Sequence, residues 1–500
     1  MAYLLGIDIG TSRAKGVAID TDGHLLGLAA QDYPIVQPQP DWAEQDPETW
    51  WQATCRVVQG ALAQAKIPGS EIAAIGLSGQ MHGTVLLGTD GRPVRPAIIW
   101  PDQRSRAEVE EVRQSTGLLR LGQLTGNRLA VGFMAASLLW LLSHEPEALA
   151  AADKAILPKD YVRLRLTGQV ATDVSDASGT LLFDVANRRW SQELLIEWKL
   201  PHWLLPPVLE STAIAGEVLP SAASELGLRP GTPVVAGAAD QACQAVGSGL
   251  LDPGWASCTI GTGGQLLIPL AAPIYDPQLR LHTFCHALPG RWYSMGATLA
   301  AGLSLRWFRE QLCLSEASFA ELAAEAARVP AGAEGLLFLP YLVGERTPHF
   351  DPLARGAFVG LTLRQGRGHA VRAIMEGVAF ALRDSLEIMR ELGPGPAQVI
   401  TAGGGGSSHP WQEILAGVFG LPVMSALGPE RTAVGAALLA GIGAGLYRDA
   451  VEARTRAVRY EPPVEPLPAD VVRYQELYAL YRELYPKLKD GFALLGRMAG

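Results

Sequence analysis

Cysteine is scarce in this chain, with five residues in 500, and the five are scattered and odd in number. They provide no disulfide framework, so a reducing compartment is expected. Long apolar runs are missing too: the uncharged stretches 414–429 and 432–447 are rich in glycine and shorter than the roughly 20 residues that span a bilayer. No basic segment precedes an apolar one at the N-terminus, so no signal peptide is visible. These features together predict a soluble cytoplasmic protein.

Positive charge is not in excess either. The chain carries 41 Lys and Arg against 50 Asp and Glu, a formal net charge of −9. Such a balance argues against non-specific binding to nucleic acid or to an anionic membrane. Hydrophobic residues make up 48% and charged residues 18%, which is an ordinary globular composition. At 500 residues the chain exceeds one typical core, so two or more domains are expected.

Three common phosphate-chemistry signatures are also missing. The chain has no Gly-x-x-x-x-Gly-Lys-Ser/Thr sequence and no Gly-x-Gly-x-x-Gly sequence. Neither a P-loop nor a dinucleotide-binding fold is therefore supported. The set of motifs that marks protein kinases is missing as well.

The chain is organised instead around residues 4–20. An apolar run predicts a buried strand that contains Asp8, where a charge is costly unless it is paired. Gly10 is expected to open a tight turn by taking a positive φ. Thr11 and Ser12 place hydroxyls on that turn, Lys15 follows, and a second strand returns. Such a turn can hold a phosphate through backbone N–H groups and hydroxyls, with Asp8 beside it as a Mg²⁺ carboxylate. An ordinary hairpin with a polar turn is the alternative.

A similar device follows half a chain later. Residues 256–268 predict a strand, the turn Gly261-Thr262-Gly263 and a returning strand. Two such hairpins suggest a duplicated fold in which each domain supplies one phosphate turn, although a chance match is an alternative. A third glycine-rich turn, with Gly404 and Gly405, lies between a buried strand and a helix, where a nucleotide can approach the backbone. A flexible linker is the alternative there.

Polar side chains follow three predicted strands at the point where each strand ends. The strand 72–78 leads to Met81 and His82, the strand 97–100 leads to Asp102, and the strand 233–239 leads to Asp240. Ligands in open α/β sheets collect at such strand ends. The alternatives are a hydrogen-bonded turn histidine for His82 and a helix N-cap for Asp240.

Other patterns complete the α/β prediction. Helices are predicted over 48–65 with Asp46 as N-cap, over 131–144 and over 370–392. A C-terminal helix carries a stripe of Tyr474, Tyr478, Tyr481 and Tyr485, interpreted as a docking surface. The residues His282, Cys285 and His286 are of metal-ligating types, but they lack a partner cluster, so a core position is favoured.

These motifs together resemble the FGGY family of carbohydrate kinases over nearly the whole chain. The resemblance is carried by the following segments: the opening Gly6-Ile7-Asp8-Ile9-Gly10-Thr11-Ser12, Trp42-Ala43-Glu44-Gln45-Asp46-Pro47, Gly79-Gln80-Met81-His82-Gly83, Leu157-Pro158-Lys159-Asp160-Tyr161, Asp240-Gln241-Ala242, Phe284-Cys285-His286-Ala287-Leu288-Pro289 and Gly344-Glu345-Arg346-Thr347-Pro348. It implies a two-domain fold like that of actin, hexokinase and Hsp70 (ribonuclease H-like), with the active site in the interdomain cleft. The domains implied are 1–242, which binds the sugar and carries the first phosphate turn, and 243–500, which binds ATP.

The resemblance also implies an activity and the residues that perform it. The expected reaction is phosphorylation of a ketopentose by ATP with Mg²⁺, with D-xylulose as the first candidate sugar. Ribulose, another ketose or a polyol is the first alternative, and a catalytically weak sugar-binding or regulatory protein is the second. A homodimer is the expected assembly. The implied roles are Asp240 as general base, Asp8 at the metal, Met81, His82, Gln241 and Asp102 at the sugar, and Gly10, Thr11, Ser12, Lys15, Gly261, Thr262, Gly263, Gly404 and Gly405 at ATP.

Three positions depart from the family pattern. Gln241 replaces the Asn of some members, Ser137 stands where Lys is usual, and Gly263 replaces a frequent Ser. None of the three is Asp8 or Asp240, so the expected reaction is kept.

Overall fold

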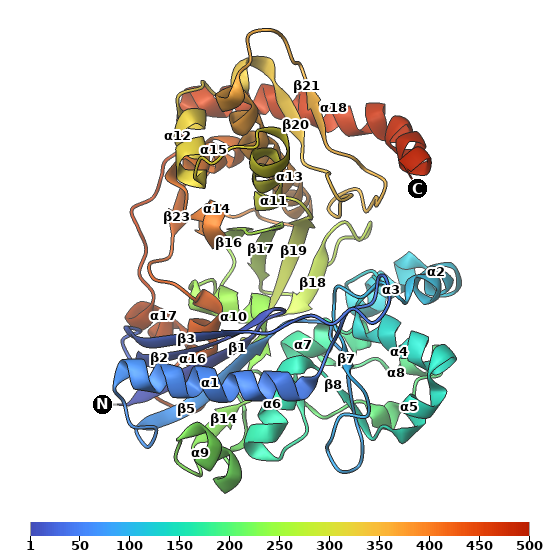
Figure 1. The fold of residues 1–500 in the computed structure, drawn as a ribbon, viewed down its shortest axis with the longest axis vertical. Helices are drawn as coiled ribbons and strands as arrows, with labels where there is room; N and C mark the ends of the chain where they lie inside the picture. The colour runs from blue at the N-terminus through green and yellow to red at the C-terminus, as the bar shows by residue number, and fades with distance from the viewer. Residues whose placement is uncertain (1, 500) are drawn as a thin grey trace.

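The computed structural model describes residues 2–499, which form two bodies, each built around a β-sheet (Figure 1). The first sheet has seven strands in the order β13-β14-β5-β1-β2-β3, and β15 also pairs with β5. Its strands are β1 (Tyr3–Ile9), β2 (Arg13–Asp20), β3 (Leu25–Asp32), β5 (Ile72–Gly79), β13 (Ile214–Glu217), β14 (Pro233–Val235) and β15 (Ala238–Ala239).

The second sheet has six strands in the order β18-β19-β17-β16-β22-β23. These are β16 (Trp255–Ile260), β17 (Gly264–Leu270), β18 (His282–Cys285), β19 (Trp292–Thr298), β22 (Gln398–Ala402) and β23 (Val423–Ser425). The two sheets repeat one arrangement: β1 is antiparallel to β2 and parallel to β5, and β16 is antiparallel to β17 and parallel to β22. The predicted pair of strand-turn-strand hairpins is therefore present.

The remaining elements of the first half lie around the first sheet. They are β4 (Glu44–Gln45), α1 (Pro47–Ala65), β6 (Val85–Leu87), β7 (Ala97–Ile98), α2 (Arg106–Ser115), α3 (Leu118–Thr125), α4 (Met134–His144), α5 (Pro146–Ala151), β8 (Lys154–Ile156), α6 (Pro158–Thr167), β9 (Thr172–Asp173), α7 (Val174–Ser178), β10 (Phe183–Asp184), β11 (Arg189–Trp190), α8 (Gln192–Glu197), β12 (Val208–Leu209), α9 (Pro220–Leu226) and α10 (Asp240–Gly247). The predicted N-cap of α1 is confirmed, because the Asp46 side chain accepts from the backbone N–H of Glu48.

The second half is richer in long helices. Its further elements are α11 (Gly302–Trp307), α12 (Phe319–Ala327), β20 (Leu337–Leu339), β21 (Ala357–Val359), α13 (Arg367–Leu392), α14 (Gly403–Gly406), α15 (His409–Phe419), α16 (Arg431–Gly443), α17 (Ala450–Ala457) and α18 (Pro468–Ala499). None of the helices within residues 2–499 is both long enough and apolar enough to pass through a membrane.

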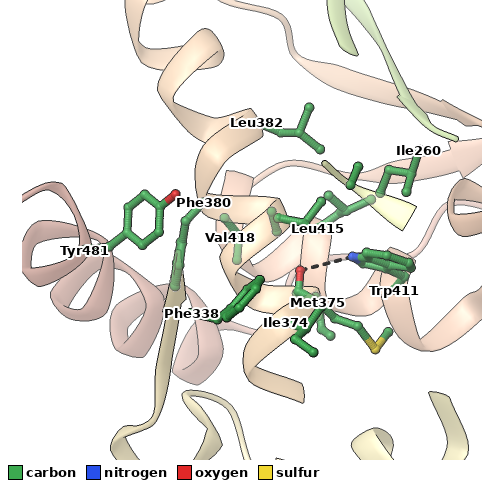
Figure 2. Packing of buried hydrophobic residues seen from close by; sticks show 14 of the residues in the cluster. Ile260, Phe338, Ile374, Met375, Phe380, Leu382, Trp411, Leu415, Val418 and Tyr481 are labelled. Atoms are coloured by element: carbon green, nitrogen blue, oxygen red, sulfur yellow. Dashed lines mark hydrogen bonds between the residues drawn. The ribbon is translucent and has the colours of Figure 1, made fainter. Parts of the chain in front are cut away.

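The core of the second half lies between α13, α15 and α18. Figure 2 shows Phe338, Phe380 and Tyr481 packed together, and Trp411 donating to the carbonyl of Met375 at 3.1 Å. The four tyrosines of α18 are all buried against this core, so the predicted docking stripe is confirmed. Buried aromatic side chains of this size supply much of the apolar area that holds a long terminal helix in place.

One helix of the second half packs against the sheet of the first. A Cβ on Gly6 of β1 would lie 1.9 Å from the carbonyl oxygen of Ala433, and one on Gly76 of β5 would lie 1.8 Å from that of Ala436. Only glycine at these two positions lets α16 approach the strands so closely. The chain therefore crosses between the two bodies after residue 430, and the domain boundary at 242/243 stays a prediction.

Several sequence predictions differ from the structure in detail. Strand β3 was not predicted, and the strand expected over 97–100 is reduced to β7. The strand expected over 233–239 is broken into β14 and β15, because Gly237 takes a left-handed φ of 79°. Gly10 does not take the positive φ that was expected. It is required because a Cβ there would lie 2.9 Å from the carbonyl oxygen of Arg13.

Candidate active site

Asp8 lies in β1, one residue before the end of the strand, and its side chain is buried. Its Oδ1 has no hydrogen-bond partner among the described residues. Burial raises the Asp8 pKa to about 6, the neighbouring Ser78 hydroxyl and the charge of Lys15 oppose the shift, and the charge of Glu430 adds to it. A buried carboxylate oxygen without a partner is costly. This oxygen therefore fits a site for a cation.

Asp240 is the first residue of α10 and directly follows β15. The N-cap of α10 is Ala239, so the interpretation of Asp240 as a helix cap is wrong. Its Oδ1 accepts from the backbone N–H of Gln241 at 2.6 Å, and its side chain keeps partial exposure. Burial and then the like charge of Asp8 raise the Asp240 pKa to about 7. A carboxyl with a pKa near the working pH suits general base catalysis.

The two acids come together through β5. Both β1 and β15 pair in parallel with this strand, with Asp8 opposite Ser78 and Ala239 opposite Gly79. The carboxyl ends of the three strands therefore meet at one edge of the sheet, and Met81 and His82 follow β5 at that same edge.

Two hydrogen bonds to Thr11 fix the first glycine-threonine turn. The hydroxyl of Thr11 accepts from Trp100 Nε1 at 2.8 Å, and the carbonyl oxygen of Thr11 accepts from Gln45 Nε2 at 2.8 Å. Ser12 is exposed on the turn. Lys15, expected to bind phosphate, forms an ion pair instead: its Nζ lies 2.6 Å from Glu430 Oε2.

His82 is held in one orientation. It has a left-handed φ of 72°, its ring stacks on Phe133 with 3.8 Å between centroids, and Nδ1 lies 2.6 Å from the carbonyl oxygen of Gly179. Burial lowers the His82 pKa to about 4, helped by the nearby charge of Arg346. The ring is therefore neutral at pH 7. A carbonyl oxygen only accepts, so Nδ1 carries the proton and Nε2 is left as an acceptor.

Met81 and the two other predicted sugar contacts lie in different surroundings. Met81 is buried, with a Cβ on Gly179 falling 2.9 Å from its Cε. Gln241 lies half-buried beside Asp240. Asp102 is buried, and its oxygens accept from the backbone N–H of Ala43 at 2.6 Å and from Arg104 at 2.7 Å. These partners favour a structural role for Asp102 over contact with a sugar.

The second glycine-threonine turn and the glycine-rich turn meet at one pocket of about 700 Å³. Gly261, Thr262, Gly404 and Gly405 all line it. Its further lining residues are Ile260, Gly302, Leu305, Arg306, Phe319, Ala320, Ala323, Ala324, Ser407, Ser408, His409, Pro410 and Trp411. A mostly apolar wall with glycine turns at one side suits a flat base with an attached phosphate chain. Gly263 is part of the turn, its carbonyl accepting from the Gly261 N–H at 2.9 Å, but it does not line the pocket.

Some residues at this site escaped sequence analysis. Gln244 of α10 donates to the Thr259 hydroxyl at 2.6 Å and so links the two halves beside Asp240. Arg346, whose charge lowers the His82 pKa, comes from the second half, and the sequence marks it only as a member of the segment 344–348. Of the metal-type residues, His282 Nδ1 lies 3.0 Å from Asn127 Oδ1 and His286 Nε2 lies 3.1 Å from the Leu250 carbonyl, so both have core partners. Ser137 is buried in α4.

Two sheets with the same hairpin-and-parallel-strand arrangement, a pair of acids at one sheet edge and a nucleotide-sized pocket at the other sheet define a two-domain α/β phosphotransferase fold. Comparison with known proteins then assigns the family. Residues 3–247 match the family model of the N-terminal domain of the FGGY family of carbohydrate kinases, and residues 256–444 match that of its C-terminal domain. The chain belongs to the FGGY family of carbohydrate kinases.

Relatives are similar over nearly their full length. The xylulose kinase of Bacillus subtilis (strain 168) is 37% identical over 490 residues, 98% of each chain. The xylulose kinase of Escherichia coli (strain K12) is 38% identical over 97% of this chain and 99% of its own. Among solved structures, a xylulose kinase from Rhodospirillum rubrum has a TM-score of 0.91 at 32% identity, covering 98% of this chain and 100% of its own.

A gluconate kinase structure from Lactobacillus acidophilus is also similar, with a TM-score of 0.93 at 28% identity and 99% of each chain covered. The two-domain fold like that of actin and hexokinase is thereby confirmed.

Proposed function

We propose that the protein phosphorylates D-xylulose with ATP and yields D-xylulose 5-phosphate and ADP. The observation that carries the proposal is Asp240, a half-buried carboxyl with a pKa raised to about 7 beside Asp8. The names of the nearly full-length relatives support xylulose as the sugar.

The proposed chemistry needs one proton acceptor and support for phosphate charge. Asp240 accepts the proton of the C5 hydroxyl as that oxygen attacks the γ-phosphorus of ATP. The O–H bond breaks, the new O–P bond forms, and the bond between the γ-phosphorus and the β,γ-bridging oxygen breaks to release ADP. Because the Asp240 pKa is near 7, a substantial fraction of the carboxyl is ionised and ready to accept at neutral pH.

Asp8 is proposed to hold Mg²⁺, on the strength of its buried Oδ1 without a partner. Mg²⁺ usually takes one or two carboxylates together with waters and substrate phosphates, and it supplies positive charge that offsets the phosphate oxygens. Gly10, Thr11 and Ser12 are proposed to face the phosphates from the first half. Gly261, Thr262, Gly404 and Gly405 face them and the nucleoside from the second, as their place in the 700 Å³ pocket supports.

The sugar is proposed to lie against Met81 and His82. His82 Nε2 is the free acceptor of a neutral ring, so it suits a hydroxyl donor of the sugar. Because one of the similar structures is a gluconate kinase, phosphorylation of a different acceptor substrate by ATP is the alternative.

The decisive experiment for this function is Asp240→Asn with a coupled assay of sugar-dependent ADP release. Loss of a general base typically costs 10²–10⁴-fold, so kcat should fall by that order while ATP binding by calorimetry stays close to wild type. Asp184→Asn, a substitution on β10 away from α10, is the matched control and should leave kcat within about twofold.

The wild-type protein should first be assayed across xylulose, ribulose, other ketoses, polyols and gluconate. Near-normal turnover in Asp240→Asn contradicts the assigned base. A sugar that ranks well above D-xylulose contradicts the assigned substrate, and sugar binding without ADP release favours the weakly catalytic alternative.

A further inference from the structure

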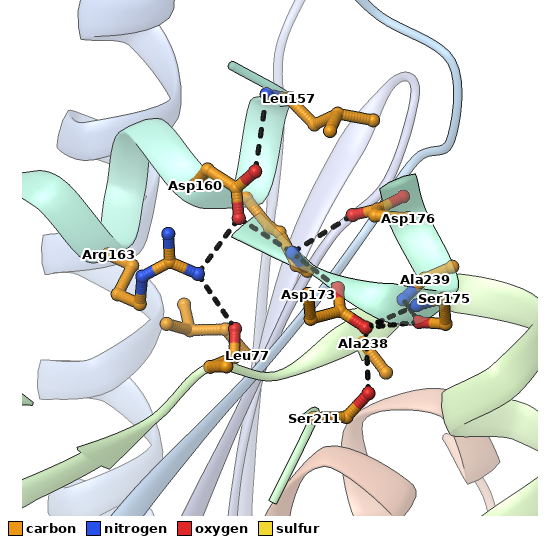
Figure 3. A network of polar contacts seen from close by, with 12 residues as sticks. Leu77, Leu157, Asp160, Arg163, Asp173, Ser175, Asp176, Ser211, Ala238 and Ala239 are labelled. Carbon is orange, nitrogen blue, oxygen red and sulfur yellow. Dashed lines mark hydrogen bonds and ion pairs between the residues drawn. The ribbon is translucent and has the colours of Figure 1, made fainter. Parts of the chain in front are cut away.

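A fully buried group of charges lies beneath the site, and the proposed chemistry does not use it. Lys159 Nζ lies 2.7 Å from Asp160 Oδ1, 2.9 Å from Asp173 Oδ1 and 3.0 Å from Asp176 Oδ2. Arg163 joins the group, 2.9 Å from Asp160. Figure 3 shows Asp160 and Arg163 on α6, and Asp173 and Asp176 on the segment of β9 and α7, as parts of one network. We call these five residues the Lys159 cluster.

The charges of the Lys159 cluster are close to balance. Burial raises the Asp176 pKa well above its usual range, and Asp173 and Asp160 add to the shift against the opposing charge of Lys159. The shift favours the protonated form of Asp176, which reduces the excess of negative charge over the two cations. Buried ion pairs are weak contributors to net stability, because desolvation offsets most of their attraction. The net contribution of the Lys159 cluster to stability is therefore expected to be small.

Hydrogen bonds connect the Lys159 cluster to Ala239, the residue before Asp240. Asp173 Oδ2 accepts from the Ser175 hydroxyl at 2.5 Å, and Ser175 Oγ in turn accepts from the backbone N–H of Ala239 at 2.9 Å. Arg163 donates to the carbonyl oxygen of Ala236 at 3.0 Å, on the other side of the break between β14 and β15. Buried polar groups thus form hydrogen bonds with both ends of the segment 236–239, which leads to Asp240. We call this segment the Asp240 corner.

The Lys159 cluster also packs against the two segments that hold His82. A Cβ on Gly79, at the end of β5, would lie 2.9 Å from the Lys159 Cβ, so the strand rests directly on this side chain. Asp176 lies in α7, and Gly179, just beyond that helix, supplies the carbonyl oxygen that fixes His82 Nδ1. The same cluster therefore borders both the proposed base and the proposed sugar contact.

We propose that the Lys159 cluster is a positioning device that fixes the Asp240 corner relative to His82, with Ser175 as the residue that transmits it. The Ser175 hydroxyl forms its hydrogen bonds with Asp173 and Ala239 and acts on Asp240 through Ala239, so Ser175 is a positioning residue. The inference rests on the proposed function, because it assumes that Asp240 acts on a sugar held by His82. Rates that depend on the placement of reacting groups fall steeply when one of them shifts.

The test compares two buried serines that donate to the same oxygen. Ser175→Ala removes the link to Ala239, whereas Ser211→Ala removes only the hydroxyl that donates to Asp173 Oδ2 at 2.7 Å. Ser175→Ala is expected to lower kcat about tenfold, the effect of one lost buried hydrogen bond, with an unchanged KM for MgATP. Ser175→Ala and Ser211→Ala should lower the midpoint of thermal unfolding by similar amounts. Ser211→Ala should leave kcat within about twofold of wild type.

Ser175→Thr is the second variant, because threonine keeps a hydroxyl for the Ala239 N–H while its extra methyl group strains a tight site. Its kcat should stay within about threefold of wild type despite a lower unfolding midpoint. Equal loss of kcat in Ser175→Ala and Ser211→Ala, or a collapse of kcat in Ser175→Thr, overturns the proposal. If Ser175→Ala does not fold, Ser175→Thr decides. Absence of sugar-dependent turnover in the wild-type protein is a different outcome, since it refutes the proposed function itself.

Discussion

At the scale of single residues, the site depends on carboxyls whose pKa values are raised by burial. Burial raises the pKa of Asp240 to about 7 and that of Asp8 to about 6, and the charge of Asp8 adds to the shift of Asp240. These differences support the roles proposed for the two acids: proton acceptor for the partly exposed Asp240, and cation ligand for the buried Asp8.

The raised Asp240 pKa has a consequence for stability. The folded state holds this proton more tightly than the unfolded state, so the contribution of Asp240 to stability is fully present below about pH 3.8 and is lost as the pH rises through about 7. Asp240→Asn should therefore be less active and yet more stable than wild type, with a gap in unfolding midpoint that widens from pH 5 to pH 8. Calorimetry at both pH values measures this gap, and a gap that narrows contradicts the shift.

Removal of the Asp8 charge should separate metal dependence from sugar binding. Asp8→Ala is expected to raise the Mg²⁺ concentration needed for half-maximal activity at least tenfold, while the affinity for the sugar measured by calorimetry changes by less than about threefold. The same variant removes a like charge, so the acidic limb of the kcat profile should move to lower pH. Weakened sugar binding with unaltered Mg²⁺ dependence reverses the roles given to Asp8 and Asp240.

At the scale of elements, local sequence patterns predict the turns, whereas the other features of the fold depend on tertiary contacts. The two hairpins and the ends of β5 and α1 were predictable, because glycine, threonine and a capping Asp46 mark them in the sequence. The break at Gly237 and the close approach of α16 to Gly6 depend on backbone that lies far away in sequence. The Lys159 cluster escaped for the same reason: its lysine and Asp173 lie on different elements, and their 2.9 Å contact exists only in the fold.

The glycine-rich turn offers a matched pair of substitutions. A Cβ on Gly405 would lie 2.3 Å from Ile260 Cγ2, whereas a Cβ on Gly404 meets nothing within 4 Å. Gly405→Ala should therefore cost about 1–3 kcal/mol of unfolding free energy through overpacking. Gly404→Ala should keep its stability and raise the KM for ATP several-fold, because the added methyl group occupies pocket space. Denaturant unfolding and ATP titrations separate the two effects. An unchanged KM in Gly404→Ala would remove this turn from the nucleotide site.

At the scale of the whole molecule, the two halves are joined beside the proposed sugar site as well as through α16. Asn127, from the first half, donates to the carbonyl oxygen of Thr283 at 2.7 Å and accepts from the Thr283 N–H at 3.0 Å, which ties it to β18. Asn127 Oδ1 also lies 3.0 Å from His282 Nδ1. This tie adds to the packing of α16 on the first sheet and to the Gln244–Thr259 hydrogen bond, so the halves are joined at several separate places.

Asn127→Ala tests this tie. All the partners of its side chain are buried, so their loss should cost about 1–3 kcal/mol of unfolding free energy. Because Phe133, which packs near His282, also stacks on His82, the KM for the sugar should rise several-fold while the KM for ATP stays close to wild type. Asn187→Ala is the matched control, since the exposed Asn187 side chain donates to the partly buried carboxylate of Asp184 within the first half. Equal effects of the two substitutions on the sugar KM would show that the tie to β18 does not shape the sugar site.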